Sequence, residues 1–211
     1  MTARILRLGE SSLPGLLPLL RVAFVVALGL TLSGCGGYNM IPTQEEFAKA
    51  KWADVQNNYQ RRADLIPNLV ETVRGYAKQE RDVLTQVIEA RAKATQIRLD
   101  PSQLTDPEKM KQFQDAQAGL SGALGRLMAV SERYPDLKSN QNFLALQSQL
   151  EGTENRITVA RRDYIDAVRT YNTTLRTLPG LLWAATLFRN NKPMAEFQAA
   201  EPAQQPPNVK F

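Results

Sequence analysis

A long apolar seam in the second half of the chain constrains the fold more than any other feature of the 211 residues. From Phe143 to Leu178, apolar or small residues recur at steps of three and four, which places them on one face of an α-helix. The seam consists of Phe143, Leu146, Leu150, Thr153, Ile157, Ala160, Tyr164, Val168, Tyr171, Leu175 and Leu178. Such regular spacing is typical of coiled-coil packing. Because a stripe of this kind must be buried against other helices, the seam predicts a helical bundle.

The same helical period runs through an earlier segment, where it predicts a first helix over about residues 44–98. Thr43 and Glu46 fit a capping box at the start of this helix. Pro67 interrupts the segment, and because proline lacks a backbone N–H, the carbonyl of Ala63 loses its helical partner. The helix is therefore expected either to kink or to break at this proline.

Two further long helices and one short helix complete the predicted fold. Asp106 is expected to cap a second helix that ends near Pro135, and a third helix is expected to start at Ser139 or Asn140. A short apolar helix follows at residues 181–188, and no segment alternates with the period of a strand. The expected fold class is all-α: an elongated antiparallel bundle of three long helices, the first kinked or broken at its proline, with a short C-terminal helix.

The N-terminal segment has the features of a bacterial lipoprotein signal peptide. Basic residues accompany an uncharged run at 22–32, which is too short to cross a bilayer. Leu32-Ser33-Gly34-Cys35 then resembles a lipobox, in which the cysteine thiol accepts a diacylglyceryl group and becomes the first mature residue. The alternative is a buried cysteine that follows an apolar helix. We expect lipid attachment, with acyl chains such as palmitate, at Cys35.

This signal divides the chain and sets its expected location. The expected segments are a signal peptide over 1–34, a lipidated linker over 35–42, a bundle over 43–200 and a Pro/Gln-rich tail over 201–211. The lipid would hold the protein on a membrane outside the cytoplasm, at the periplasmic face. Gly36 stands where an aspartate would resemble an inner-membrane retention signal, so the outer membrane is slightly favoured. Val209 and Phe211 are expected to rest on the bundle.

Composition argues against most classes of catalytic and metal site. The chain has no histidine and one cysteine, which removes imidazole bases, histidine metal ligands, cysteine clusters and intramolecular disulfides. Glu151 and Glu154 lie three residues apart, but a di-iron site would need histidines beside such carboxylates, and no cleft-forming architecture supports a glycosidase pair. Loss of the signal peptide would lower the formal net charge from +5 to about +3. We expect no enzyme, no cofactor, no metal and no nucleic-acid partner.

A polar layer is expected where the proline interrupts the first helix. Aligning the third helix with the first brings residues 153–156 level with residues 62–68. The expected members are Arg61, Arg62, Asp64, Asn68, Glu154, Asn155 and Arg156. Either arginine of the first helix would pair with Glu154, and Asp64 would pair with Arg156. Asn68 or Asn155 would approach the carbonyl that the proline frees. The alternative is a solvated helix face with local ion pairs.

Two other features each allow a structural and a functional interpretation. Small residues form a stripe on the second helix, which favours close approach of a neighbouring helix at the polar layer or, alternatively, a shallow groove for a partner. The stripe consists of Ala118, Gly122, Gly125 and Ala129. Trp183 and Phe188 on the short helix are expected to cap the end of the bundle, with contact to a partner or a membrane as the alternative.

These motifs together resemble the LemA family. The segment Arg61–Val73, RRADLIPNLVETV, closely resembles the family's hallmark sequence. The further matches are Tyr38-Asn39, Tyr134 to Leu137, Asn142-Phe143, Thr153 to Ile157, Ala160 to Arg162, Tyr171-Asn172 and Pro207 to Phe211. The resemblance covers residues 38–211 in order, although Ile165 stands where the family usually has asparagine after a tyrosine.

The resemblance implies a helical bundle that is tethered to a membrane with most of its mass outside the cytoplasm. It implies no catalytic residues, and the activity of the family is poorly defined. It also suggests a partner among membrane proteins of the TPM-domain type. We therefore expect a lipid-anchored scaffold or interaction protein of the cell envelope. The alternatives are an accessory subunit of an envelope enzyme and a cell-wall polymer binder that uses exposed arginines.

Overall fold

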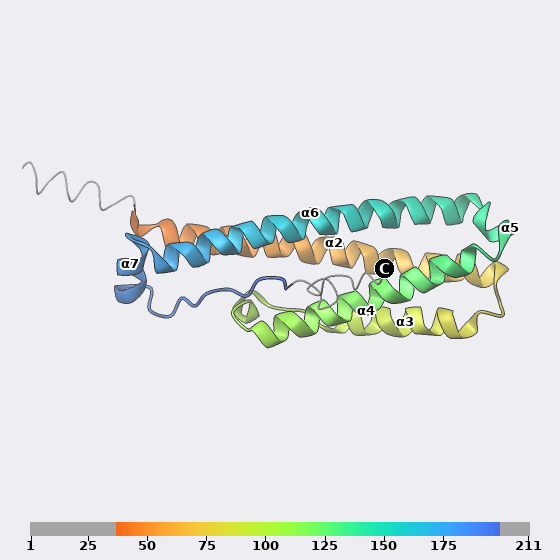
Figure 1. Ribbon diagram of the computed structural model, residues 1–211, viewed down its shortest axis with the longest axis horizontal. Coiled ribbons are helices and arrows are strands. Elements are labelled where there is room, and N and C mark those ends of the chain that lie inside the picture. The colour runs from red at the N-terminus through yellow and green to blue at the C-terminus, as the bar shows by residue number, and fades with distance from the viewer. Residues whose placement is uncertain (1–36, 199–211) are drawn as a thin grey trace, which may run out of the picture. The chain divides into compact units, whose positions relative to one another are not determined.

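A computed structural model describes residues 37–198 of the chain (Figure 1). The chain divides into two compact units, Met1–Met40 and Ile41–Phe211, and most described residues lie in the second. The expectations for the signal peptide, for Cys35 and for the tail, including Val209 and Phe211, concern residues outside the described part.

Within residues 37–198 the fold is all-α, as predicted. The long helices are α2 (Met40–Tyr76), α3 (Arg81–Gln96), α4 (Pro107–Ser131) and α6 (Gln141–Arg176). The short elements are a 3₁₀ turn at Pro101–Gln103, α5 (Pro135–Lys138) and α7 (Gly180–Thr186). Successive long helices run in opposite directions, and α6 returns alongside α2 (Figure 1). The bundle is therefore antiparallel.

The predicted first helix is in fact two helices, and this is the main correction to the expected fold. The chain passes through Pro67 without a break, and α2 ends only at Tyr76. It then turns at residues 77–80, and α3 folds back against α2 and α4. The turn follows Gly75, a poor helix former, and is continued by the polar run 78–82. The bundle thus has four long helices instead of three.

The predicted helix starts are confirmed at two positions. The side chain of Asp106 accepts hydrogen bonds from the backbone N–H groups of Glu108 and Lys109, which caps α4. Asn140 likewise accepts from the N–H of Phe143 and caps α6. Each cap satisfies backbone donors that a helix leaves unpaired at its first turn.

Two predicted helix ends are wrong by a few residues. Since α2 begins at Met40, Thr43 lies inside the first turn and is not the cap. Since α6 ends at Arg176, Leu178 lies outside the helix and is 69% exposed instead of continuing the apolar seam.

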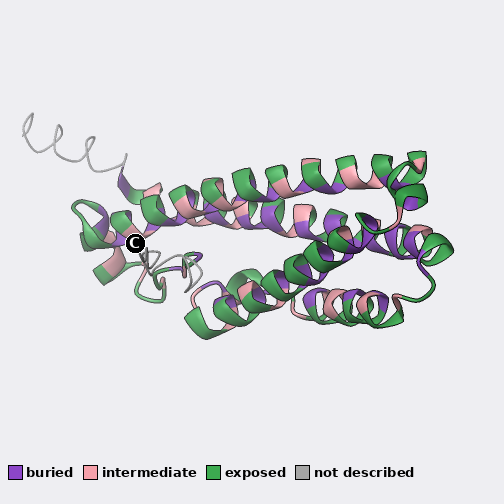
Figure 2. Cartoon of the chain, turned by 45° about the vertical axis from the view of Figure 1, so that its right-hand side comes forward, coloured by how far each residue is buried: buried purple, intermediate pink, exposed green. Residues whose placement is uncertain are grey.

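The core consists of two apolar clusters that follow one another along the bundle. The first gathers residues 41–59 of α2 and 157–175 of α6 with the start of α4 and the segment 194–197. The second gathers residues 66–73 of α2 with α3, most of α4 and the start of α6. Buried residues accordingly line the facing sides of the long helices (Figure 2). The boundary between the clusters falls at residues 60–65 of α2.

Candidate functional site

A buried arginine occupies the boundary between the two apolar clusters. Arg62 of α2 is 1% exposed. Its Nη1 donates to Ser121 Oγ and to Glu154 Oε1, both at 2.8 Å. Its Nη2 donates to Gln117 Oε1 at 2.6 Å and to the Gln117 carbonyl at 3.3 Å. We call these four side chains, Arg62, Gln117, Ser121 and Glu154, the polar layer.

The polar layer surrounds the guanidinium with groups that favour its charge. The ring of Tyr59 lies 5.0 Å below the guanidinium carbon, which is a cation–π distance. Burial raises the pKa of the Tyr59 hydroxyl, so that ring stays neutral. The Nε of Arg62 has no partner among the described residues. The carboxylate of Glu154 is 46% exposed on its side chain, so solvent screens this ion pair in part.

Two further hydrogen bonds extend the polar layer to α3. The Nε2 of Gln117 donates to the carbonyl of Ala94 at 3.1 Å. The Nε of Arg91 donates at 2.8 Å to the carbonyl of Ala63, the group that Pro67 deprives of its helical partner. All four long helices therefore meet at one level through side-chain hydrogen bonds.

Of the seven residues expected in a polar layer, the structure brings two together, Arg62 and Glu154. The others lie on exposed faces: Arg61, Asp64, Asn68, Asn155 and Arg156. Asp64 accepts from Gln60, and Arg156 donates to Thr153, so the expected pair between them does not form. The carbonyl freed by the proline is satisfied by Arg91 of α3 because α3 folds back beside it.

The small-residue stripe does not make room for the polar layer. Ala118, Gly122, Gly125 and Ala129 are all exposed. A methyl group added at Gly125 would meet no atom within 4 Å, and one at Gly122 would meet only a side-chain atom of Arg126 at 3.9 Å. The expectation of close helix approach at this stripe is therefore wrong.

Sequence reasoning missed Gln117 and Ser121, although the pattern of α4 contains a signal for the first. Phe113, Gln117, Leu120 and Leu124 follow one another at steps of four, three and four, and all four are buried. A glutamine at a seam position of a helix needs buried hydrogen-bond partners. Gln117 at a seam position of this helix therefore indicates a polar contact inside the bundle.

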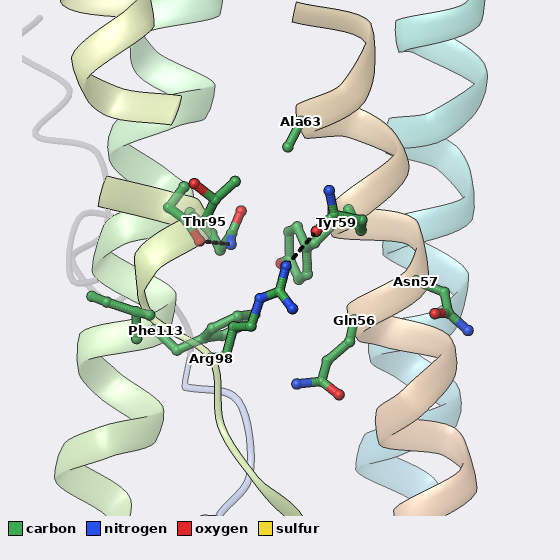
Figure 3. Close-up of a pocket in the computed structure, with 11 residues that line it drawn as sticks. Gln56, Asn57, Tyr59, Ala63, Thr95, Arg98 and Phe113 are labelled. Carbon is green, nitrogen blue, oxygen red and sulfur yellow. Dashed lines mark hydrogen bonds between the residues drawn. The ribbon is translucent and has the colours of Figure 1, made fainter. Parts of the chain in front are cut away.

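A groove with a volume of about 310 Å³ lies beside the polar layer. It lies between α2, the end of α3 and the first half of α4. Its lining residues are Gln56, Asn57, Tyr59, Gln60, Ala63, Ala94, Thr95, Ile97, Arg98, Phe113 and Gln117. Figure 3 shows Arg98 reaching from the end of α3 toward α2, where it donates to Gln60 Oε1 at 3.1 Å. We call the groove lined by these residues the amide groove.

The amide groove offers mainly hydrogen-bonding groups, because its two aromatic residues, Tyr59 and Phe113, are only 7% and 3% exposed. Four of its lining residues are glutamine or asparagine, which both donate and accept, and Arg98 is its one cation. Tyr59 and Phe113 stack edge to face at 5.3 Å between their ring centres at its base. The lining includes no carboxylate, cysteine or serine, and its hydroxyl groups are those of Tyr59 and Thr95.

The C-terminal segment is held in the bundle by side chains of α6. Asn172 accepts from the backbone N–H of Met194 at 2.9 Å and donates to the carbonyl of the same residue at 2.9 Å. Tyr164 donates to the carbonyl of Ala195 at 3.0 Å, and burial raises the pKa of its hydroxyl. Phe197 packs against the ring of Trp52 at 6.0 Å. Residues 194–197 therefore pack against the first apolar cluster, whereas α3 packs against the second.

The described residues form neither a cluster of metal-ligand side chains nor a membrane-spanning helix. No group of three or more acidic or cysteine side chains within 37–198 is arranged to hold a metal ion. None of the helices in this part of the chain combines the length and the apolar character needed to cross a membrane.

Comparisons with known proteins agree on one family. The model described as LemA family matches residues 51–211. The magnetosome proteins MamQ 1 and MamQ 2 of Paramagnetospirillum magneticum are each 29% identical over 219 residues, covering 96% of this chain and 78% of the relative. Protein LemA of Metamycoplasma hominis is 26% identical over 147 residues, covering 70% of this chain and 62% of that protein.

Proposed function

The chain belongs to the LemA family, and from this premise we propose that it is a membrane-associated scaffold of the cell envelope that binds other proteins and has no catalytic activity. The observation that carries the proposal is the polar layer. Hydrogen bonds from Arg62 and Gln117 reach all four long helices and fix their register. A body of fixed register presents its surface residues at constant spacing, which is what a scaffold needs.

The amide groove supports a binding role on the surface of this body. Gln117 and Gln60 are already bonded within the bundle, so a partner's backbone N–H and C=O groups would pair with Asn57 and with the Oε1 of Gln56. Membrane proteins of the TPM-domain type stay among the partners we propose. Arg98 is exposed beside the groove, so a partner that enters would meet it.

We propose attachment to the membrane through a lipid on Cys35, outside the cytoplasm at the periplasmic face and with the outer membrane slightly favoured. The lipobox-like sequence Leu32 to Cys35 supports this attachment. One acyl chain binds a bilayer only marginally, whereas several bind stably, so a fully acylated cysteine would keep the protein on the membrane. The relatives named as magnetosome proteins agree with a role at membranes.

The test is photo-crosslinking in intact cells from one position beside the groove. A photoreactive residue replaces Arg98, and a matched variant carries it at Arg169, an exposed arginine of α6. We expect protein adducts from position 98 that are absent from position 169, identified by mass spectrometry. Equal adducts from both positions, or none from either, would contradict a binding role for the groove.

A cell-wall polymer binder is the second candidate, and the same groove favours it. Amide side chains such as Gln56 and Asn57, beside the guanidinium of Arg98, also suit the hydroxyl groups of a sugar. Adducts from position 98 that contain glycan and no protein would select this alternative. An accessory subunit of an envelope enzyme would instead show one enzyme as the constant adduct.

A further inference from the structure

Apolar side chains gather on the outer surface of α7 and its flanking residues. Four of the ten exposed large apolar side chains of the described residues fall within residues 178–187. They are Leu178, Leu181, Leu182 and Leu187, exposed by 69%, 45%, 60% and 60%. Isolated exposed leucines need no explanation, but a cluster of this kind marks a contact surface.

The position of α7 is fixed by close packing, so the leucines do not turn inward. Trp183 and Phe188 pack against the first apolar cluster, which confirms that they cap the end of the bundle. A methyl group on Gly180 would lie 2.2 Å from the carbonyl oxygen of Thr174, so the backbones of α7 and α6 are in direct contact there. The four leucines are therefore held at the surface of this end of the bundle.

The residues that flank the leucines are basic. Arg176, Arg189 and Lys192 are exposed, and residues 176–192 contain no acidic residue. Glu45, which accepts from Asn191, shares one cation, Lys49, with Glu46 at 2.8 and 2.7 Å, so these three residues carry a net charge of −1 against the three basic residues. Within residues 37–198 none of the three basic residues has a carboxylate partner, and leucines edged by such residues match the boundary between the acyl chains and the headgroups of an anionic bilayer.

The beginning of the bundle lies at the same end as α7 (Figure 1). Thr174 donates to the side chain of Gln44, and Asn191 donates to Glu45 Oε2 at 2.6 Å. Ile41 follows Cys35 by six residues, which span at most about 20 Å. A lipid on that cysteine would therefore bring this end of the bundle close to the bilayer.

We propose that residues 178–188 form a membrane-contacting surface, with Leu178, Leu181, Leu182 and Leu187 seated among the lipids and Arg176, Arg189 and Lys192 at the anionic headgroups. The occupant is a phospholipid bilayer. The leucine cluster and its basic flanks carry this proposal, and only the distance argument rests on the proposed anchor at Cys35.

The test measures the depth of a spin label on the full-length protein in vesicles of phosphatidylethanolamine and phosphatidylglycerol. Leu182→Cys carries the nitroxide, and Leu144→Cys, an exposed leucine at the far end of α6, is the matched control. Relaxation by oxygen, which concentrates in the bilayer, is compared with relaxation by a water-soluble nickel chelate. We expect the ratio of the two at position 182 to exceed that at position 144 several-fold.

Equal ratios at the two positions in vesicles would overturn the proposal. A label that is aqueous in vesicles but shielded in native membranes would assign the surface to a protein partner and overturn it as well. Adding Leu181→Asp should bring the label at position 182 back toward the aqueous ratio, whereas Val159→Asp, at an exposed site on α6, should not. The reverse result would also contradict bilayer contact.

The anchor is tested separately in the same preparation. The chain has one cysteine, so a wild-type protein that takes up label has a free Cys35 and contradicts the proposed lipid. The depth measurement then proceeds in a Cys35→Ser background, where its outcome still decides for or against the surface at residues 178–188.

Discussion

At the scale of single residues, Arg62 is the buried charge around which the polar layer is built. It is the only charged residue among the fully buried side chains of residues 37–198. A buried charge is costly unless it is paired and hydrogen-bonded. Three side chains from α4 and α6 meet this requirement, and the ring of Tyr59 adds a fourth contact. Loss of any of them should therefore be felt as a loss of stability.

A double-mutant cycle on Arg62 and Glu154 measures this dependence. Glu154→Gln should cost about 1–2 kcal/mol of unfolding free energy, because the buried guanidinium loses its carboxylate. Arg62→Met should cost about 1–3 kcal/mol, because Gln117 and Ser121 lose their donor. The coupling energy in urea unfolding should reach about 1 kcal/mol. Arg61→Met, at the exposed neighbour, serves as the control and should show no coupling energy with Glu154. A coupling energy below about 0.5 kcal/mol for Arg62 would mean that its pair with Glu154 contributes no more than a surface ion pair.

Buried tyrosines predict how stability depends on pH. Burial raises the pKa of Tyr164 in the folded protein, whereas the unfolded chain ionises its tyrosines near pH 10. Above about pH 10 the unfolded state therefore binds fewer protons than the folded state, and the free energy of unfolding falls with rising pH. Tyr164→Phe should cost about 1 kcal/mol at neutral pH, through the lost bond to Ala195, and should make the alkaline decline shallower. An unchanged slope in urea unfolding from pH 9 to about 11 would refute this assignment.

At the scale of elements, the helices explain which features the sequence could and could not predict. The α6 seam and the caps Asp106 and Asn140 depend on local spacing and local hydrogen bonds, so they can be predicted from the sequence. The pairing of Arg62 with Glu154 follows from the antiparallel register of α2 and α6, which does not depend on where the first helix ends.

The features that could not be predicted depend on contacts between distant segments. The polar run 78–82 can form an exposed helix face or a turn, and only the packing of Leu84 and Val87 back on the second cluster decides for the turn. The hydrogen bonds of Asn172 to Met194 join a helix to an irregular segment, which leaves no periodic signal. The small residues of α4 predicted close approach of a neighbouring helix, but no other helix lies against the glycines of that stripe.

Asn172 should control how firmly the segment 193–198 is held. Asn172→Ala removes both hydrogen bonds to Met194 and should cost about 1–3 kcal/mol. The backbone N–H of Ala195, which donates to Leu104 at 2.7 Å, should then exchange its hydrogen faster. Asn142→Ala, at an exposed asparagine of α6, serves as the control and should leave that exchange unchanged. Equal protection of Ala195 in both variants would show that other contacts hold the segment.

At the scale of the whole bundle, the polar layer both interrupts the apolar core and connects its two parts. It divides the apolar core into two clusters, and each cluster could in principle unfold without the other. Hydrogen bonds across the boundary oppose this, because they tie α2, α3, α4 and α6 at one level. We therefore interpret the layer as the connection that makes the two clusters one rigid body, on which the proposed scaffold role depends.

Native-state hydrogen exchange measures directly whether the two clusters open together. If the polar layer joins them, the slowest amides of the first cluster, such as Val55 and Val168, should open with the same free energy as those of the second, such as Leu69 and Leu127. Arg62→Met should lower both values together. Two different opening free energies in the wild-type protein, or a loss confined to one cluster in the variant, would contradict the claim that the polar layer joins the bundle into one body.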